Sequence, residues 1–349
     1  MNTTTQTETR AYQGMLIWAL IVGLSFPAVA LVSEGLPPLA LTAIRFSVAA
    51  LVIGPLVWSK PGFWPSLRGL VLYLILGSCL AGFFAIMFWA AHRTTALSMA
   101  TLYVSVPLLA YFLGRLIGVE KRAHGLLIIL MLGASGALAL AWAGADGRLN
   151  GMNFGVGEAA YFLGCIASAF YPVLSKWGLK EELLSPRADI RTFWSLISGG
   201  VLVAVLALLS EDLQLLTTMS LTDAAVVLYL GIFSSGLTFW LTQRATAVLT
   251  PGAVTAYSYL VPFVSMLLLF IEEPQLIGWH WLPGSVLVLF AISTLLRGGI
   301  KTEISVSSTL AMALRMRNQA KTLKWRAVTS LRDVASSKSN MSRRASSKT

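Results

Sequence analysis

Residues 77–120 read GSCLAGFFAIMFWAAHRTTALSMATLYVSVPLLAYFLGRLIGVE, and the rest of the chain repeats their plan. Two apolar runs flank a short polar break at residues 92–95. Pro107 lies inside the second run and Glu120 closes it. Apolar runs of this length, joined by so short a break, predict a pair of antiparallel helices.

Residues 231–273 have the same plan: GIFSSGLTFWLTQRATAVLTPGAVTAYSYLVPFVSMLLLFIEE. Here the break is at residues 243–244, the internal proline is Pro262 and the closing acid is Glu273. The two prolines are 155 residues apart and the two acids 153 residues apart. Such self-similarity predicts a duplicated unit of about 150 residues.

The composition predicts an integral membrane protein. Of the 349 residues, 56% are hydrophobic and 12% are charged, whereas soluble domains carry about 25% charged residues. Apolar runs of about 20 residues recur from Met15 to Leu296, long enough to cross a hydrocarbon core of about 30 Å as helices. The runs are continuously apolar and do not alternate, which favours helices over a β-barrel.

We therefore predict an all-α membrane protein with ten transmembrane helices arranged as two inverted five-helix repeats. The odd number of helices in each repeat forces the two halves to insert with opposite orientation. The predicted spans are 14–33, 39–58, 69–89, 97–118, 124–144, 155–174, 191–210, 222–243, 251–271 and 279–296. The predicted parts are an N-terminus (1–13), a first repeat (14–150), a second repeat (151–298) and a tail (299–349).

The distribution of basic residues predicts that both termini are cytoplasmic. With the N-terminus inside, eleven Lys and Arg residues fall at the inner ends and loops and two at the outer loops. This count assigns Arg191 to an inner helix end. Segment 297–349 adds twelve basic and two acidic residues, so it carries +10 of the net charge of +11.

The basic tail is expected to be disordered and solvated because of its low-complexity, Ser/Lys/Arg-rich end. The alternative is that residues 301–349 bind anionic lipid at the membrane surface. The tail is too short and too low in complexity to predict a nucleic-acid partner.

Several motifs resemble those of the drug/metabolite transporter superfamily, in its EamA-like ten-helix branch. They are Leu16-Ile17-Trp18, Glu34-Gly35-Leu36-Pro37-Pro38, Ala43-Ile44-Arg45-Phe46, Val106-Pro107-Leu108, Gly118-Val119-Glu120 and Leu260-Val261-Pro262-Phe263. The resemblance covers roughly residues 14–298 and implies transport of a small molecule across a bacterial inner membrane. The sequence departs from the family pattern at Trp18-Ala19 and at Trp89-Ala90-Ala91-His92, where the family's central cavity is expected.

Arg45 is the first candidate for substrate binding. It lies about six residues into the second predicted helix, where a cation is costly unless it meets protein, water or an anion. Arg45 is a candidate counter-charge, either for a carboxylate-bearing substrate or for an acid inside the protein. The alternative is a structural arginine that bonds helix-end carbonyls near Glu34.

Aromatic side chains within the spans are further candidates for lining a substrate cavity. For each of them the alternative role is packing against neighbouring helices, without contact to a substrate. They are Trp18, Trp89, Tyr103, Tyr171, Trp240, Tyr257 and Tyr259. Aromatics near span ends, such as Trp58, Trp64 and Trp279, are expected to anchor the helices at the membrane interface.

Three further residues are candidates for the transport cycle. Glu158 opens the sixth helix and is a candidate for proton or ion coupling, or an acid stabilised by the helix dipole. Pro107 and Pro262 fall within helices and are candidate hinges, or static bends.

The sequence thus favours a secondary transporter, and an exporter, of a small metabolite or amino-acid-like solute that works by alternating access. No catalytic or metal-binding pattern, phosphate loop or dinucleotide fingerprint is found, so neither an enzyme nor a cofactor is predicted. The alternative is a non-transporting membrane protein, either a lipid-modifying enzyme or a scaffold that uses its basic tail. The small-residue run 133–137 suits close packing within the bundle or in a homodimer.

Overall fold

The structure is a computed structural model that describes residues 3–91, 93–120, 123–144 and 155–296. The predicted tail, including residues 301–349, lies outside the described residues, as do His92 and Arg148. The described part is helical and contains no strand. Ten of its helical segments are long and apolar enough to cross a membrane, which confirms the predicted fold class.

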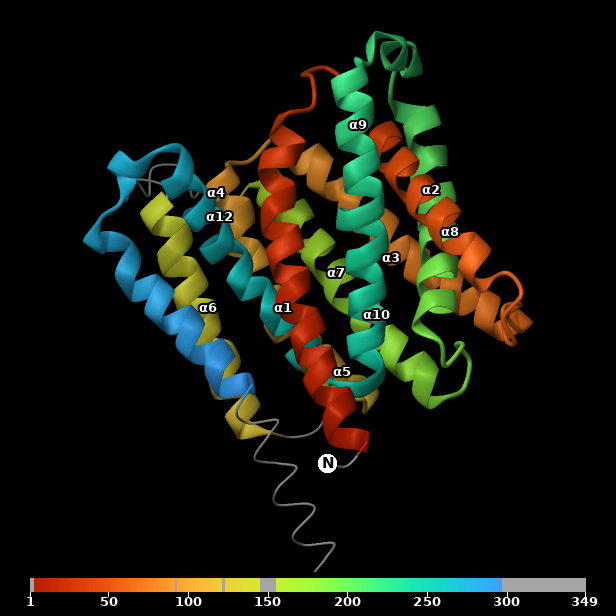
Figure 1. The fold of residues 1–349 in the computed structure, drawn as a ribbon, viewed down its shortest axis with the longest axis horizontal. Helices are drawn as coiled ribbons and strands as arrows, with labels where there is room; N and C mark the ends of the chain where they lie inside the picture. The colour runs from red at the N-terminus through yellow and green to blue at the C-terminus, as the bar shows by residue number, and fades with distance from the viewer. Residues whose placement is uncertain (1–2, 92, 121–122, 145–154, 297–349) are drawn as a thin grey trace, which may run out of the picture. The chain divides into compact units, whose positions relative to one another are not determined.

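The helices follow the expected order (Figure 1). The first half contains α1 (Thr3–Ala30), α2 (Pro38–Val57), α3 (Leu67–Ala91), α4 (Ala96–Tyr103), α5 (Val106–Ile117) and α6 (His124–Gly144). The second half contains α7 (Val156–Lys180), α8 (Ala188–Ser210), α9 (Leu221–Tyr229), η2 (Leu230–Leu237), α10 (Thr238–Val248), α11 (Pro251–Thr255), η3 (Ala256–Tyr259) and α12 (Leu260–Glu272). The tenth span is Trp279–Leu296, and η1 (Leu213–Thr218), η4 (Pro274–Leu276) and η5 (Trp279–Trp281) are short 3₁₀ turns.

The fourth and ninth spans, which contain Pro107 and Pro262, are both broken just before the proline. The fourth span divides into α4 and α5, and Pro107 lies in the first turn of α5. The ninth span passes from α11 through η3 to α12, where Pro262 is the third residue. A proline is tolerated in a first turn because the amide it lacks has no partner within the helix.

The eighth span has an irregularity that the sequence did not predict. Between α9 and α10 the chain passes through η2, an eight-residue π-helical segment. Gly231 and Gly236 bring η2 close to α2: a Cβ at Gly231 would lie 3.2 Å from the carbonyl oxygen of Arg45. Segments of π-helix are frequent at functional sites.

We call the end of the bundle where α1 begins the proximal end and the opposite one the distal end (Figure 1). Successive spans alternate in direction, so α2, α4, α7 and α9 begin at the distal end and α12 ends there. The spans that start distally in the first half correspond to spans that start proximally in the second.

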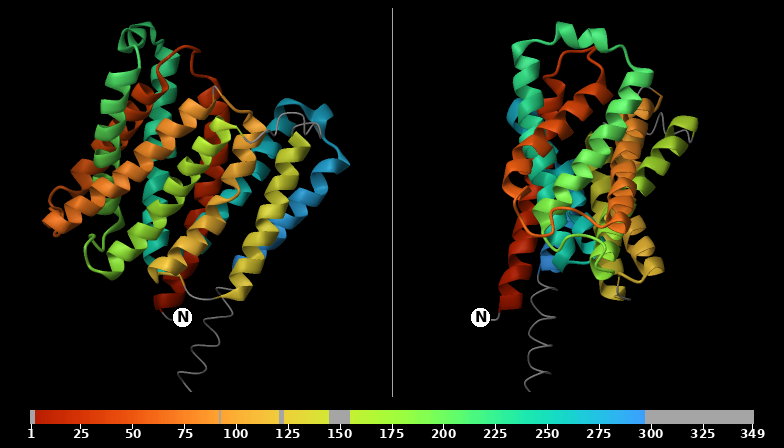
Figure 2. Two further views of the ribbon diagram at one scale, coloured as in Figure 1. Left: turned by 180° about the vertical axis from the view of Figure 1, so that it is seen from behind. Right: turned by 90° about the vertical axis from the view of Figure 1, so that its right-hand side faces the viewer.

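Helix packing divides the buried core into two main clusters. One joins α1, α6, α11, α12 and the tenth span, and the other joins α2, α3, α7 and α8. At one edge α6 lies beside the tenth span (Figures 1 and 2), where a Cβ at Gly136 would lie 2.8 Å from the amide nitrogen of Val288. Gly133 packs against Tyr259, so glycines of the run 133–137 are used within the bundle.

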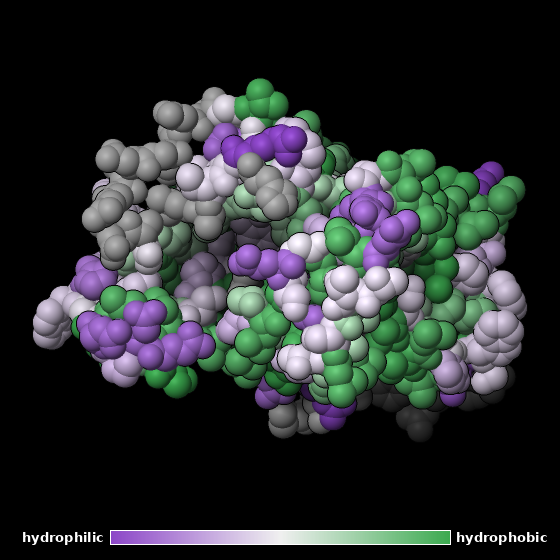
Figure 3. Space-filling model, turned by 90° about the horizontal axis from the view of Figure 1, so that it is seen from above, coloured by the Kyte–Doolittle hydropathy of each residue, from purple (hydrophilic) through white to green (hydrophobic). Residues whose placement is uncertain are grey.

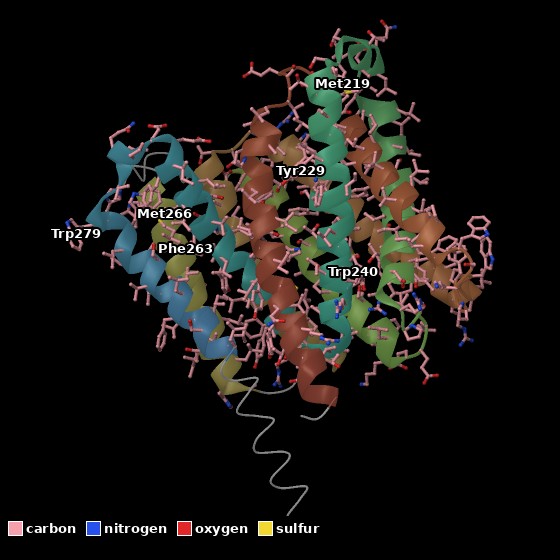
Figure 4. The ribbon with its side chains drawn as sticks, in the orientation of Figure 1. Met219, Tyr229, Trp240, Phe263, Met266 and Trp279 are labelled. Carbon is pink, nitrogen blue, oxygen red and sulfur yellow. The ribbon has the colours of Figure 1, made fainter. Side chains whose placement is uncertain are left out.

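The outer surface of the bundle is apolar, as a lipid-facing surface must be. Leu51 and Leu116 are 74% and 84% exposed, and many other large apolar side chains are exposed with them. Trp58, Trp64 and Trp279 near the span ends are also exposed. In Figure 4 the side chain of Trp279 projects away from the bundle. The protein is therefore an integral membrane protein.

Candidate functional site

Arg45 lies in the second span with few partners. Pro38 begins α2, so Arg45 is about 10 Å along the helix at 1.5 Å per residue. Its Nη2 donates to Ser234 Oγ in η2 at 3.3 Å, and its buried Nε has no hydrogen-bond partner. In the described part of the chain no carboxylate forms an ion pair with it. The guanidinium thus retains unused donors inside the membrane.

Arg191 is a second arginine within a span, in the first turn of α8 (Ala188–Ser210). The seventh helix was predicted to begin at residue 191, with Arg191 at its inner end. The helix α8 instead begins at Ala188, and the Arg191 side chain is fully buried.

Three acceptors hold Arg191. Its Nε donates to Gln243 Oε1 at 2.9 Å, Nη2 to the carbonyl oxygen of Gln243 at 2.6 Å, and Nη1 to the carbonyl oxygen of Ser185 at 2.7 Å. Gln243 in turn donates to Tyr171 Oη at 2.8 Å and to Ser175 Oγ at 3.0 Å. The network joins α7, α8 and α10 at their proximal ends, and a fully satisfied network of this kind makes a region rigid.

The sequence analysis missed Gln243 as part of this network. The sequence contains a signal for it, because one short pattern occurs in both halves. The first half has Phe88-Trp89 and, after two residues, His92-Arg93; the second half has Phe239-Trp240 and, after two residues, Gln243-Arg244. That match places a hydrogen-bonding side chain at corresponding points of the two halves. The partner of Gln243 could not be read from it, because the bond connects residues 52 apart in the chain.

Two hydrogen bonds join the two halves at the proximal end. The Glu120 carboxylate, which follows α5, accepts a hydrogen bond from the Gly252 amide at the start of α11 (2.9 Å). Lys180 Nζ at the end of α7 donates to the carbonyl oxygen of Gly118 at 3.4 Å. Glu120 therefore caps a helix of the other half.

The distal end is arranged differently. Glu273, the matching acid of the second half, is exposed and accepts from Gln275 Nε2 of its own turn at 3.3 Å. By analogy with Glu120 it would cap α4, but α4 packs on α6 and α7. The two matching acids therefore differ: Glu120 bonds the other half and Glu273 does not. At the distal end the halves are joined by other groups, since Asp223 accepts from Ser33 and Glu211 accepts from the amides of Leu39 and Ala40.

Glu158 lies in the first turn of α7 and is buried. Its Oε2 accepts from the Gly155 amide at 3.0 Å, and its Oε1 accepts from the Thr94 hydroxyl. These contacts cap the helix and tie α7 to the turn before α4. They match the helix-end interpretation of this acid, and its role in coupling stays a prediction.

The predicted aromatic residues are not gathered in one place. Trp89 is exposed, and Tyr103 packs against Phe83, with 5.9 Å between ring centroids. Tyr171 is buried in the Arg191 network, and Tyr257 is buried with an unpartnered hydroxyl. Two more lie elsewhere: Trp18 packs against the first core cluster, and Trp240, labelled on α10 in Figure 4, has the Arg244 guanidinium 5.3 Å from its ring.

Trp89 lines a cavity of about 410 Å³ that opens on the distal half of the bundle. Its walls come from α2, α3, α7 and α8 and are apolar except for Ser210. Viewed from the distal end, the molecule is hollowed near its middle, and hydrophilic side chains are scattered around the hollow (Figure 3). Among the described residues no group of three or more His, Cys, Asp or Glu side chains could hold a metal ion.

Comparison with known proteins finds transporters of similar sequence. Similar curated proteins include an uncharacterized transporter, YetK, of Bacillus subtilis, which is 23% identical over 272 residues, or 76% of this chain and 80% of YetK. An uncharacterized inner membrane transporter, YedA, of Escherichia coli K12 is 24% identical over 258 residues, or 71% of this chain and 78% of YedA. Both relatives are named as transporters.

A solved structure titled "Crystal structure of protein" shares the fold. It superimposes with a TM-score of 0.66 at 17% identity and covers 83% of this chain and 97% of its own. The sequence model of the EamA-like transporter family matches residues 9–142 and 155–297, so it matches most of the membrane-embedded part. The chain belongs to the EamA-like transporter family.

Proposed function

We propose that this membrane transporter is a secondary transporter that exports a small metabolite or amino-acid-like solute by alternating access. In this proposal it lies in a bacterial inner membrane with both termini in the cytoplasm, so the proximal end is the cytoplasmic end. The solute passes between the two repeats. The name of the E. coli relative, an inner membrane transporter, supports the location.

One observation carries the mechanism: the two halves share a sequence plan but differ in contact. The first half closes on the second through the Glu120 carboxylate and the Gly252 amide, while the matching acid Glu273 stays in its own turn. Inverted repeats that alternate between two such arrangements open a site to one side at a time.

Flux through the purified protein tests the proposal. Full-length protein is reconstituted into liposomes that are loaded with one unlabelled solute, and counterflow of the same labelled solute is measured. The panel consists of amino acids and small carboxylic acids, with empty liposomes as the control. We expect saturable counterflow of at least one solute, and its dependence on a pH gradient reports proton coupling.

The orientation is tested separately, because the direction of transport depends on it. Reporter fusions after Arg10 and after Arg297 should both indicate the cytoplasm. A periplasmic signal from either fusion would contradict the proposed placement. Saturable flux directed outward in whole cells, with retention in a deletion strain, is the expected result for an exporter.

A further inference from the structure

The two arginines within spans differ in how their donors are used. Arg191 is fully buried and donates to three acceptors at 2.6–2.9 Å, so protein groups satisfy its guanidinium. Arg45 makes one long bond, to Ser234 Oγ at 3.3 Å, and its buried Nε has no partner. The protein itself thus shows what a structural arginine looks like here, and Arg45 does not match it.

An unpaired guanidinium at this depth is costly. A cation about 10 Å inside a span destabilises the protein unless protein groups, water or an anion meet it. Over the described residues the ion pair that forms is between Arg187 and Asp189, near the proximal end of α8. No acid of the described chain compensates Arg45, so its counter-charge is expected to come from elsewhere.

The neighbouring segment η2 contributes polar groups at the same place. Ser234 already contacts Arg45, and Ser235 has a buried hydroxyl with no hydrogen-bond partner. Gly231 and Gly236 hold η2 against α2, since a Cβ at Gly236 would lie 3.4 Å from Ala49 Cβ. Backbone packing thus holds η2, with Ser234, against the part of α2 that carries Arg45.

We propose that Arg45, together with Ser234, binds a carboxylate of the transported solute, so that the solute is an organic acid or a zwitterion. A guanidinium offers parallel N–H donors that match the two oxygens of a carboxylate. A single arginine balances one negative charge, which favours a monocarboxylate over a phosphate dianion. This inference rests on the proposed transport function and specifies its substrate class.

The test compares acids with their amides. L-Leucine, L-phenylalanine and L-alanine and their carboxamides are used as competitors in the counterflow assay, and as ligands in thermal-shift measurements on the purified full chain. The acids should compete and stabilise at least about tenfold more effectively than the amides, as expected for a hydrogen-bonded ion pair. Arg45→Gln should remove this preference.

Two further variants keep the test usable if Arg45→Gln does not fold. Arg45→Lys keeps the charge but loses the paired donors, and should give intermediate discrimination. Ser234→Ala leaves the arginine in place and should weaken binding of the acids less than Arg45→Gln does. Size-exclusion profiles and unfolding temperatures identify any variant that has lost its fold, and the remaining ones then carry the test.

The outcomes separate the two proposals. If acids and amides move equally well, or if the preference for acids survives in Arg45→Gln, the carboxylate site is wrong and the transport function stands. If no solute in the panel moves or binds, the proposed function fails for this class of solute, and the carboxylate site fails with it.

Discussion

Arg191 provides the most direct prediction at the scale of single residues. Arg191→Met removes donors from two carbonyl oxygens and from the Gln243 amide oxygen, all buried between helices. We expect it to lower the free energy of unfolding by about 3 kcal/mol or more, because each unsatisfied buried acceptor is costly. The measurement is the unfolding temperature in detergent.

Arg187→Met is the matched control. Arg187 lies four residues earlier, is 42% exposed and pairs with Asp189. Exposed ion pairs contribute about 0–1 kcal/mol. If both variants unfolded at the same temperature, the Arg191 network would not hold the helices together.

The sequence predicted some of these residues and not others, for a physical reason. Arg45 was recognisable because it lies inside an apolar run, where any cation stands out. Arg191 was not, because a helix end and a buried first turn look the same in sequence. Its environment is decided by Gln243 and Ser185, which the fold brings to it.

At the scale of elements, the broken spans are the feature to test. Pro107 and Pro262 each lie in the first turn of a helix segment, just after a break. Replacing either with alanine restores an amide that can donate to the carbonyl four residues earlier and so continue the helix through the break. We expect Pro107→Ala and Pro262→Ala to slow counterflow several-fold while the proteins remain folded.

Pro55→Ala is the control for this prediction, since Pro55 lies within the continuous helix α2 and not at a break between segments. It should transport at close to the wild-type rate. Normal flux in both Pro107→Ala and Pro262→Ala would mean that the breaks are static bends.

The prolines made these breaks predictable, but no feature of the sequence predicted the π-helical segment η2. A π-helical segment has no proline or composition signal of its own. It depends on contact with α2 through Gly231 and Gly236. These glycines lie 193 and 198 residues beyond Pro38, the first residue of α2, but are adjacent to α2 in space. Such a segment is set by tertiary packing, and its role next to Arg45 became visible only in the structure.

At the scale of the whole membrane-embedded part, the two halves repeat one sequence plan but do not make the same contacts. The duplication was readable from the spacing of prolines and acids, and ten spans followed from apolar runs. The difference between the proximal and distal ends was not readable. A sequence encodes both states of a cycle, and a single structure samples one of them.

A disulfide across the proximal end tests whether that difference is part of a cycle. A Cβ at Gly252 would lie 3.3 Å from Tyr111 Cβ, close to the separation of about 3.5–4.5 Å found in disulfides. In a background with Cys79 and Cys165 replaced by alanine, Tyr111→Cys with Gly252→Cys should form this bond on oxidation. Counterflow should then fall to the level of empty liposomes and recover with reductant.

The two single-cysteine variants, oxidised in the same way, are the controls and should keep their activity. Loss of maleimide labelling shows how much of the double variant has formed the bond. Full counterflow by fully cross-linked protein would contradict an alternating opening at this place.

The Glu120 contact has a consequence for how such proteins diverge. Its partner is the main-chain amide of Gly252, and Glu211 likewise accepts from the main-chain amides of Leu39 and Ala40 at 2.8 Å each. Every residue except proline supplies an amide, so the residue on the receiving side can drift without breaking the bond. Pairwise covariation between aligned sequences should therefore overlook these joints between the two halves.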